Sequence, residues 1–231
     1  MDYEALLEAF YTQLSLAGAT VIDVGAHTGR HSIPLAARVG AEGIVHAFEP
    51  IPPIRSQLVE NLESAGVWNV VVYPFALASK SGAVQFHYIP NLPQESGIKP
   101  RHIYNAPIDP PQLLNLFAHS LDEVLPNTDV AFLKIDIEGG ELDMLNGAGR
   151  TLTTARPIVS FECGAASFLG YHDRPQDLFR IFHDRGYAVH SILGDLIVDE
   201  QAFREAGYAQ NVWDYVAFPL EKSGLAQLLV R

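Results

Sequence analysis

The feature that most constrains this chain is a regular alternation between short apolar segments and helical patterns of apolar side chains. Four segments have the length and the β-branched or aromatic content of buried strands, and they lie at residues 21–24, 44–49, 130–137 and 158–162. Apolar side chains at helical spacing separate them, at residues 54–62 and 141–152. Strands that alternate with helices, with glycine at the joints, predict a parallel sheet covered by helices on both faces.

The two ends of the chain extend this prediction. A length of 231 residues is enough for one α/β domain, so we expect residues 1–231 to form a single domain. Residues 1–18 have the apolar spacing of an amphipathic N-terminal helix. The segments YAVHSILG and DYVAFPL, at residues 187–194 and 214–220, predict a late pair of strands separated by a short hairpin and a helix.

One stretch interrupts the alternation. Residues 90–111 are polar and contain six prolines, Pro90, Pro93, Pro100, Pro107, Pro110 and Pro111. Because proline lacks a backbone N–H, so many of them exclude a helix or a central strand there. Long loops in compact domains are often functional. We therefore expect an insertion near the functional site, a candidate lid over a bound substrate, and a disordered linker is the alternative.

Charge and cysteine content narrow the classes of partner. The formal net charge is −12, from 15 basic and 27 acidic residues, and no run of basic residues occurs. Such a surface repels phosphate backbones and anionic lipids, so nucleic acid is not expected as a partner. No apolar run approaches the roughly 20 residues that span a bilayer, so membrane insertion is not expected either. Cys163 is the only cysteine, which excludes an intrachain disulfide and a cysteine-based zinc site. The first residues lack the basic-then-apolar layout of a secretion signal, so we expect a cytoplasmic protein.

The joint after the first strand reads VIDVGAHTGRHS and has the features of a ligand-binding loop. Gly25 and Gly29 let the backbone approach a ligand at the start of a helix. His27 stands where dinucleotide-binding loops have their middle glycine, and Asp23 precedes the loop. An acid here would repel a pyrophosphate but suits a ligand with a cationic amino-acid end. An ordinary strand–helix turn is the alternative.

Two further strand ends carry acidic residues. Glu49 ends the second strand, at the place where doubly wound folds bind the hydroxyls of a ribose. In FLKIDIEGGE, a period of two would place Lys134, Asp136 and Glu138 on one face of the strand. Burying three ionisable groups in a row is costly unless they form ion pairs or take part in binding or catalysis. A buried Lys134–Asp136 ion pair that only holds the loop is the alternative, and Glu162 adds an acid at the same rim.

Taken together, these segments resemble the FkbM family of S-adenosylmethionine-dependent methyltransferases. The resemblance runs from about residue 21 to about residue 162, and its most specific part is LKIDIEGGE with the following LDMLNGA; DVGAHTG, FEP and SLDEV support it. The resemblance implies an α/β, Rossmann-like class I methyltransferase fold, with a mostly parallel seven-stranded sheet, helices on both faces and an antiparallel last strand. It also implies S-adenosylmethionine as the methyl donor, with S-adenosylhomocysteine as its product.

The family pattern further implies roles for individual residues. The donor's amino-acid moiety would be lined by Asp23, Gly25, Ala26 and Gly29, its ribose hydroxyls would be held by Glu49, and its adenine would be bordered by Ala76 and Leu77. The groups facing the transferred methyl and the acceptor would be Asp136, Glu138 and Lys134, with Asp136 also touching the donor. Glu138 is the favoured acceptor ligand, and His102 in the insertion is a weaker candidate base.

The function expected from these residues is O-methylation of a hydroxyl on a sugar, a glycolipid or another small natural product. The partner would then be a small-molecule or glycan acceptor. Asp136, Glu138 and Glu162 could hold a hard cation, but no metal is predicted. Two other functions compete: a nicotinamide-dependent oxidoreductase, which His27 in the glycine loop disfavours, and a non-catalytic nucleoside-binding module.

Overall fold

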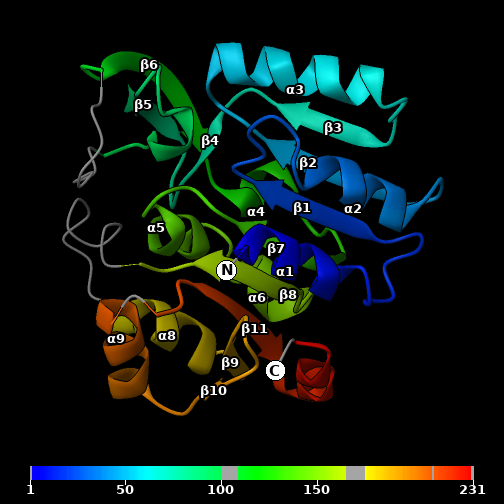
Figure 1. Cartoon of the computed structure of the whole chain (residues 1–231), viewed down its shortest axis with the longest axis vertical. Helices are drawn as coiled ribbons and strands as arrows, with labels where there is room; N and C mark the ends of the chain where they lie inside the picture. Colours follow the sequence, from blue (N-terminus) through cyan, green and yellow to red (C-terminus); the bar gives the residue numbers. More distant parts are fainter. Residues whose placement is uncertain (1, 100–108, 165–174, 210, 230–231) are drawn as a thin grey trace.

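A computed structural model describes residues 2–99, 109–164, 175–209 and 211–229 of the chain. Its main sheet has the strand order β10-β9-β11-β8-β7-β1-β2-β3 (Figure 1). The strands of this sheet are β1 (Thr20–Val24), β2 (Ile44–Phe48), β3 (Val70–Tyr73), β7 (Val130–Ile135), β8 (Ile158–Glu162), β9 (Tyr187–Ser191), β10 (Leu196–Ile197) and β11 (Asp214–Pro219). The four strands predicted from apolar runs correspond to β1, β2, β7 and β8.

The directions of the strands confirm the expected class of fold, with one correction. Strands β3, β2, β1, β7 and β8 pair in parallel, and β11 lies antiparallel between β8 and β9. The last strand is therefore antiparallel, as predicted. The prediction of seven strands was wrong, because the two-residue strand β10 pairs with β9 and makes an eighth at the edge.

Helices cover both faces of the main sheet, because its central strands are apolar on both sides. On one face, Val21, Val45 and Phe132 pack with α1 (Tyr3–Tyr11) and α2 (Ser32–Val39). The prolines at 52 and 53 form the first turn of α3 (Pro52–Ser64), whose Leu58 packs near Ala47. The remaining helices are α4 (Leu121–Val124), α5 (Glu141–Asn146), α6 (Gly149–Thr154), α8 (Pro175–His183), α9 (Glu200–Ala209), η1 (Pro93–Glu95) and η2 (Leu220–Leu228).

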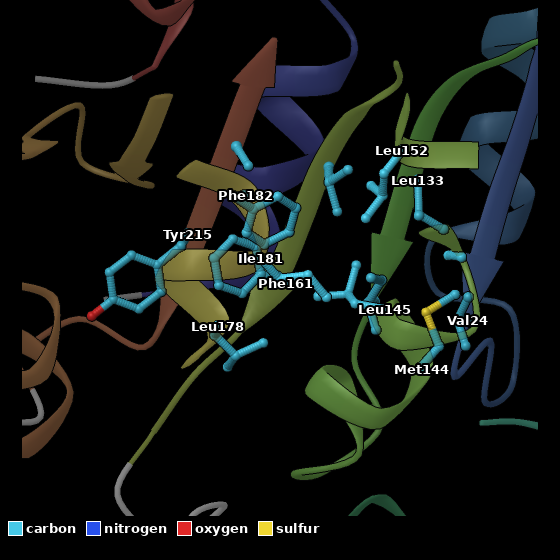
Figure 2. Close-up of a cluster of buried hydrophobic side chains, with 14 of the residues drawn as sticks. Val24, Leu133, Met144, Leu145, Leu152, Phe161, Leu178, Ile181, Phe182 and Tyr215 are labelled. Carbon is cyan, nitrogen blue, oxygen red and sulfur yellow. The ribbon is translucent and has the colours of Figure 1, made fainter. Parts of the chain in front are cut away.

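The other face carries a larger hydrophobic cluster. Figure 2 shows strand residues such as Leu133 and Phe161 directed toward side chains from α5 and α8, including Met144 and Phe182. These four residues are fully buried or nearly so. This packing fixes β7 and β8 side by side, and so it sets the positions of the acidic residues that follow them.

A small second sheet, β4-β6-β5, was not predicted. Its strands are β4 (Ala76–Leu77), β5 (Gly82–Tyr88) and β6 (Gln112–His119), and it appears at the upper left of Figure 1. Antiparallel β5 and β6 form the two arms that flank the proline-rich segment. Their pairing joins residues far apart in sequence on partly exposed strands, so the local pattern carried little signal.

The helix predicted over 141–152 is interrupted, which is a further correction. It divides into α5 and α6 because Gly147 lies against Ala78: a Cβ on Gly147 would lie 2.2 Å from the Ala78 carbonyl oxygen. The Gly147 carbonyl also accepts a hydrogen bond of 3.0 Å from the backbone of Asp122. The N-terminal helix is shorter than the 1–18 segment and ends at Tyr11. Among the described residues, no helix is both long and apolar enough to cross a bilayer.

Candidate active site

A cavity of about 250 Å³ opens at the carboxyl ends of the parallel strands, above β1 and β7. The strand order reverses between these two strands, because β2 and β3 extend to one side and β8 to the other. Ligands of open α/β sheets bind at such a switch point. The cavity wall combines residues from the ends of β1, β2 and β7 with residues of the small sheet.

The glycine loop after β1 lines the cavity through Gly25 and Ala26. Gly25 has a φ of 78°, and a Cβ there would lie 1.8 Å from the Asp136 carbonyl oxygen. Glycine is therefore required because the β1 loop packs on the backbone of the β7 loop. Gly29, with a φ of 95°, is outside the cavity lining, and its missing Cβ makes room for Leu58 of α3. Gly29 therefore lets the loop pack against α3, and its contact with the donor stays a prediction.

Asp23 lies on the floor of the cavity and also contacts partners within the protein. Its side chain is 0% exposed. The Ser32 hydroxyl donates to Asp23 Oδ2 at 2.6 Å, and Lys134 Nζ lies 3.5 Å from Asp23 Oδ1. These contacts tie β1 to the start of α2 and to β7. Asp23 therefore forms part of the floor of the cavity, with its carboxylate beside the Lys134 ammonium.

Lys134 connects Asp23 to Asp136. Its ammonium lies 3.3 Å from Asp136 Oδ2, so the ion pair considered from the sequence is present. Burial disfavours the charged form, but the carboxylates of Asp136 and Asp23 outweigh it and raise the pKa of Lys134 above its ordinary value. The strand ends at Ile135, and Glu138 has a φ of 62°, so the expected single face of alternating residues does not extend to Glu138.

Glu49 stands at the end of β2, as predicted, and is held rigidly. Its two carboxylate oxygens accept backbone hydrogen bonds from His27 at 3.0 Å and from Ile51 at 2.8 Å. Burial raises the pKa of Glu49 to about 7 despite these bonds. Ala76 and Leu77 of β4 line the same cavity. The segments that follow β2 and β3 therefore line the same cavity.

Acidic side chains converge at the rim beyond β7 and β8. Carboxylate oxygens of Asp136, Glu138 and Glu162 lie within 4.8 Å of one another, close enough to hold a cation together. The loop between Asp136 and α5 is organised by Glu141, whose carboxylate accepts hydrogen bonds from the backbone N–H groups of Ile137 and Gly139. Burial raises the pKa of Glu141 to about 7. No sequence pattern indicates this role, because Glu141 resembles an ordinary acidic residue in the first turn of a helix.

Several lining residues were not predicted. Glu4 of α1 borders the cavity, and so does Arg30, which follows Gly29. Pro93, Gln94, Ser96 and Ile98 also line it, so the first part of the proline-rich segment forms one wall. The rest of that segment, including His102, falls outside the described residues.

Solved structures of methyltransferases have a similar fold. An FkbM methyltransferase from Methylobacillus flagellatus KT has a TM-score of 0.55 and 16% identity, over 89% of this chain and 45% of that one. A proposed rRNA methylase from Clostridium thermocellum has a TM-score of 0.54 and 12% identity, over 92% of each chain. A SAM-dependent O-methyltransferase from Thermotoga maritima has a TM-score of 0.53 and 13% identity, over 94% of this chain and 64% of that one.

At these identities the likeness shows the fold alone, and this chain spans less than half of the Methylobacillus protein's length. No curated protein matches the chain in sequence. The sequence profile of the methyltransferase FkbM domain, however, matches residues 23–189, which is most of the chain. That span contains the glycine loop, Glu49 and the acidic rim, and the chain therefore belongs to the FkbM family of S-adenosylmethionine-dependent methyltransferases.

Proposed function

We propose that the protein transfers the methyl group of S-adenosylmethionine to a hydroxyl oxygen of a small molecule, such as a sugar, a glycolipid or another natural product. The observation that carries the proposal is that one cavity contains the glycine loop, Glu49 and the acidic residues after β7. A donor site and a group able to accept a proton therefore face the same space.

The charge of the cavity favours a cationic donor. Its lining holds five carboxylate side chains and two lysine or arginine side chains; the carboxylates belong to Glu4, Asp23, Glu49, Asp136 and Glu138. This excess of acid attracts a sulfonium and repels the pyrophosphate of a nicotinamide dinucleotide. The charge thus argues against the oxidoreductase alternative.

The fixed groups suggest how the donor lies. Glu49 is positioned by two backbone N–H groups and would accept hydrogen bonds from the ribose hydroxyls. Ala76 and Leu77 give an apolar border for the adenine. Gly25 and Ala26 approach the donor from β1, and Asp136 faces it from β7. Asp23 supports this arrangement indirectly, by holding Lys134.

The reaction needs alignment, exclusion of water and removal of one proton. When bound, S-adenosylmethionine supplies an electrophilic methyl group. The chain's part is to orient the acceptor hydroxyl and to take its proton as the new oxygen–carbon bond forms. Glu138 at the rim is the proposed proton acceptor, with Asp136 beside it. Lys134 is held as a cation by two carboxylates, so it acts as a positioning residue for Asp136 rather than as a base.

A screen of paired acceptors tests this proposal. The protein is incubated with donor carrying a labelled methyl group and with sugars or phenols, each matched by the amine that replaces the hydroxyl. The proposal predicts label on the hydroxyl compounds and its loss in Glu138→Gln. Label that appears only on the amines would contradict O-methylation, and donor binding without any turnover would favour the nucleoside-binding module.

A further inference from the structure

Helix α1 lies outside the part of the chain that matches the family, yet it reaches the cavity. Glu4 lines the cavity, although the family match begins at residue 23. Its carboxylate is bonded to Nε2 of His31, and Nδ1 of His31 is 3.0 Å from the hydroxyl of Tyr11. The His31 side chain is 4% exposed and that of Glu4 is 51% exposed. Glu4 is therefore anchored from behind while part of it remains open to a ligand.

Arg30 borders the same cavity. It follows the glycine loop, its side chain is 46% exposed, and its guanidinium is 2.5 Å from a carboxylate oxygen of Glu8. Among the described residues of the lining, the other arginine or lysine is Lys134, which is 5% exposed and held by two carboxylates. Arg30 is thus the cation that a ligand's carboxylate can reach.

The amino-acid end of the donor needs one anionic and one cationic partner. The family pattern implied Asp23 for its ammonium, but that carboxylate is fully buried, accepts a hydrogen bond from Ser32 and lies beside the Lys134 ammonium, which would repel a second cation. We propose that Glu4 binds the ammonium and Arg30 the carboxylate of the donor's amino-acid end, so that α1 completes the donor site. This inference rests on the proposed function and names two recognition residues for it.

The chemistry of the two side chains fits this zwitterionic group. Arginine presents a planar fork of N–H donors that matches a carboxylate. Glu4 is anionic at neutral pH, as a glutamate ordinarily is, and its hydrogen bond to His31 lowers its pKa further. Glu8 can release Arg30, since an exposed ion pair contributes little free energy. Donor binding would therefore replace the ion pair between Arg30 and Glu8 with one between Arg30 and the donor's carboxylate.

Calorimetric titration with two ligands tests the inference. S-adenosylhomocysteine has the amino-acid end, whereas 5′-methylthioadenosine keeps the nucleoside and the sulfur and lacks that end. Glu4→Gln and Arg30→Gln should each weaken binding of S-adenosylhomocysteine about 10-fold or more, the cost of one charged hydrogen bond. Binding of 5′-methylthioadenosine should be unchanged in both variants. Arg30→Lys keeps the charge and should lose less affinity than Arg30→Gln.

A matched control separates recognition from packing. Glu8→Gln removes the partner of Arg30 but no proposed ligand of the donor, so it should retain wild-type affinity or bind more tightly. Equal weakening of both ligands in Glu4→Gln and Arg30→Gln, or no weakening, would overturn the inference. If wild-type protein bound neither ligand, the proposed function itself would fail. Far-ultraviolet circular dichroism of each variant checks that α1 has remained helical.

Discussion

The two ends of the cavity are built in different ways. At the nucleoside end, Glu49 is fixed by two backbone N–H groups and lies next to the well-packed ends of β1 and β2. At the rim, the carboxylates of Asp136 and Glu138, which follow β7, meet that of Glu162 at the end of β8, and Glu138 has a left-handed φ. His27, which donates to Glu49, also has a left-handed φ, and such strain tends to occur at functional sites.

This difference indicates a division of labour. At the nucleoside end, hydrogen bonds fix the Glu49 carboxylate in one position, which suits the binding of a single donor. The rim is acidic, and Glu138 there has a left-handed φ. Separate donor and acceptor regions would allow one fold to serve different acceptors. Lys134 links the two ends through Asp23 and Asp136.

The largest expected effect comes from breaking that link. Lys134→Met leaves the buried carboxylate of Asp23 without its cation, and removing one partner of a buried ion pair costs about 3–5 kcal/mol. Chemical denaturation should therefore show a large fall in the free energy of unfolding. Lys80→Met, at an exposed position, is the control. A fall no larger than the control's would mean that Lys134 does not join the two ends.

The rim is tested by Glu138→Gln. We expect turnover to fall about 100-fold or more, because a proton acceptor is lost. The affinity for S-adenosylhomocysteine should stay at the wild-type value, because the nucleoside end is intact. Single-turnover rates and calorimetry on the same preparation measure the two quantities. A parallel loss of both would show that the rim and the donor site are not separable.

The nucleoside end is tested by Glu49→Gln. Loss of charged hydrogen bonds to the ribose should weaken donor binding about 10- to 100-fold. Glu60→Gln, an exposed glutamate on α3, should bind as the wild type does. Unchanged affinity in Glu49→Gln would place the ribose elsewhere.

A smaller effect is expected from pH. Burial raises the pKa of Glu49 to about 7, so its carboxylate becomes fully ionised only above neutrality. Donor affinity should rise up to about tenfold between about pH 6 and about pH 8, in proportion to the ionised fraction. Glu49→Gln should remove this rise. A wild-type affinity that falls over the same range would contradict the role of Glu49.

The raised pKa values of buried glutamates also change the stability of the fold with pH, in the opposite direction to donor affinity. Glu49 and Glu141 both have a pKa raised from 4.5 to about 7 in the folded protein. The folded state therefore binds more protons than the unfolded state between these values, and the free energy of unfolding should fall as pH rises from 4.5 to about 7. Denaturation curves of Glu141→Gln should depend on pH less steeply than those of the wild type.

Much of the nucleoside end could be predicted from the sequence, because it depends on local patterns. Apolar runs located β1, β2 and β7, and the residues that follow them fall at one edge because parallel strands share a direction. The predicted residues Gly25, Glu49, Leu77 and Asp136 all line one cavity. The fold class follows from the same alternation.

The remaining features depend on contacts between distant parts of the chain. Asp23 could be located but not its burial, because Ser32 and Lys134 occupy it only in the folded protein. The break at Gly147 depends on the carbonyl oxygen of Ala78. Glu4 sits on an ordinary amphipathic helix, and nothing in its neighbourhood in the sequence indicates a cavity. These features require tertiary contacts that no local pattern encodes.

The most direct test of the account is calorimetric titration of the purified protein with S-adenosylmethionine and S-adenosylhomocysteine, with NAD as the control. Micromolar affinity is about −8 kcal/mol of binding free energy, which is ample for a donor site of this kind. The account predicts binding of both sulfur nucleosides in that range and none of NAD. Binding of NAD, or of none of the three, would contradict the assignment of this cavity to the methyl donor.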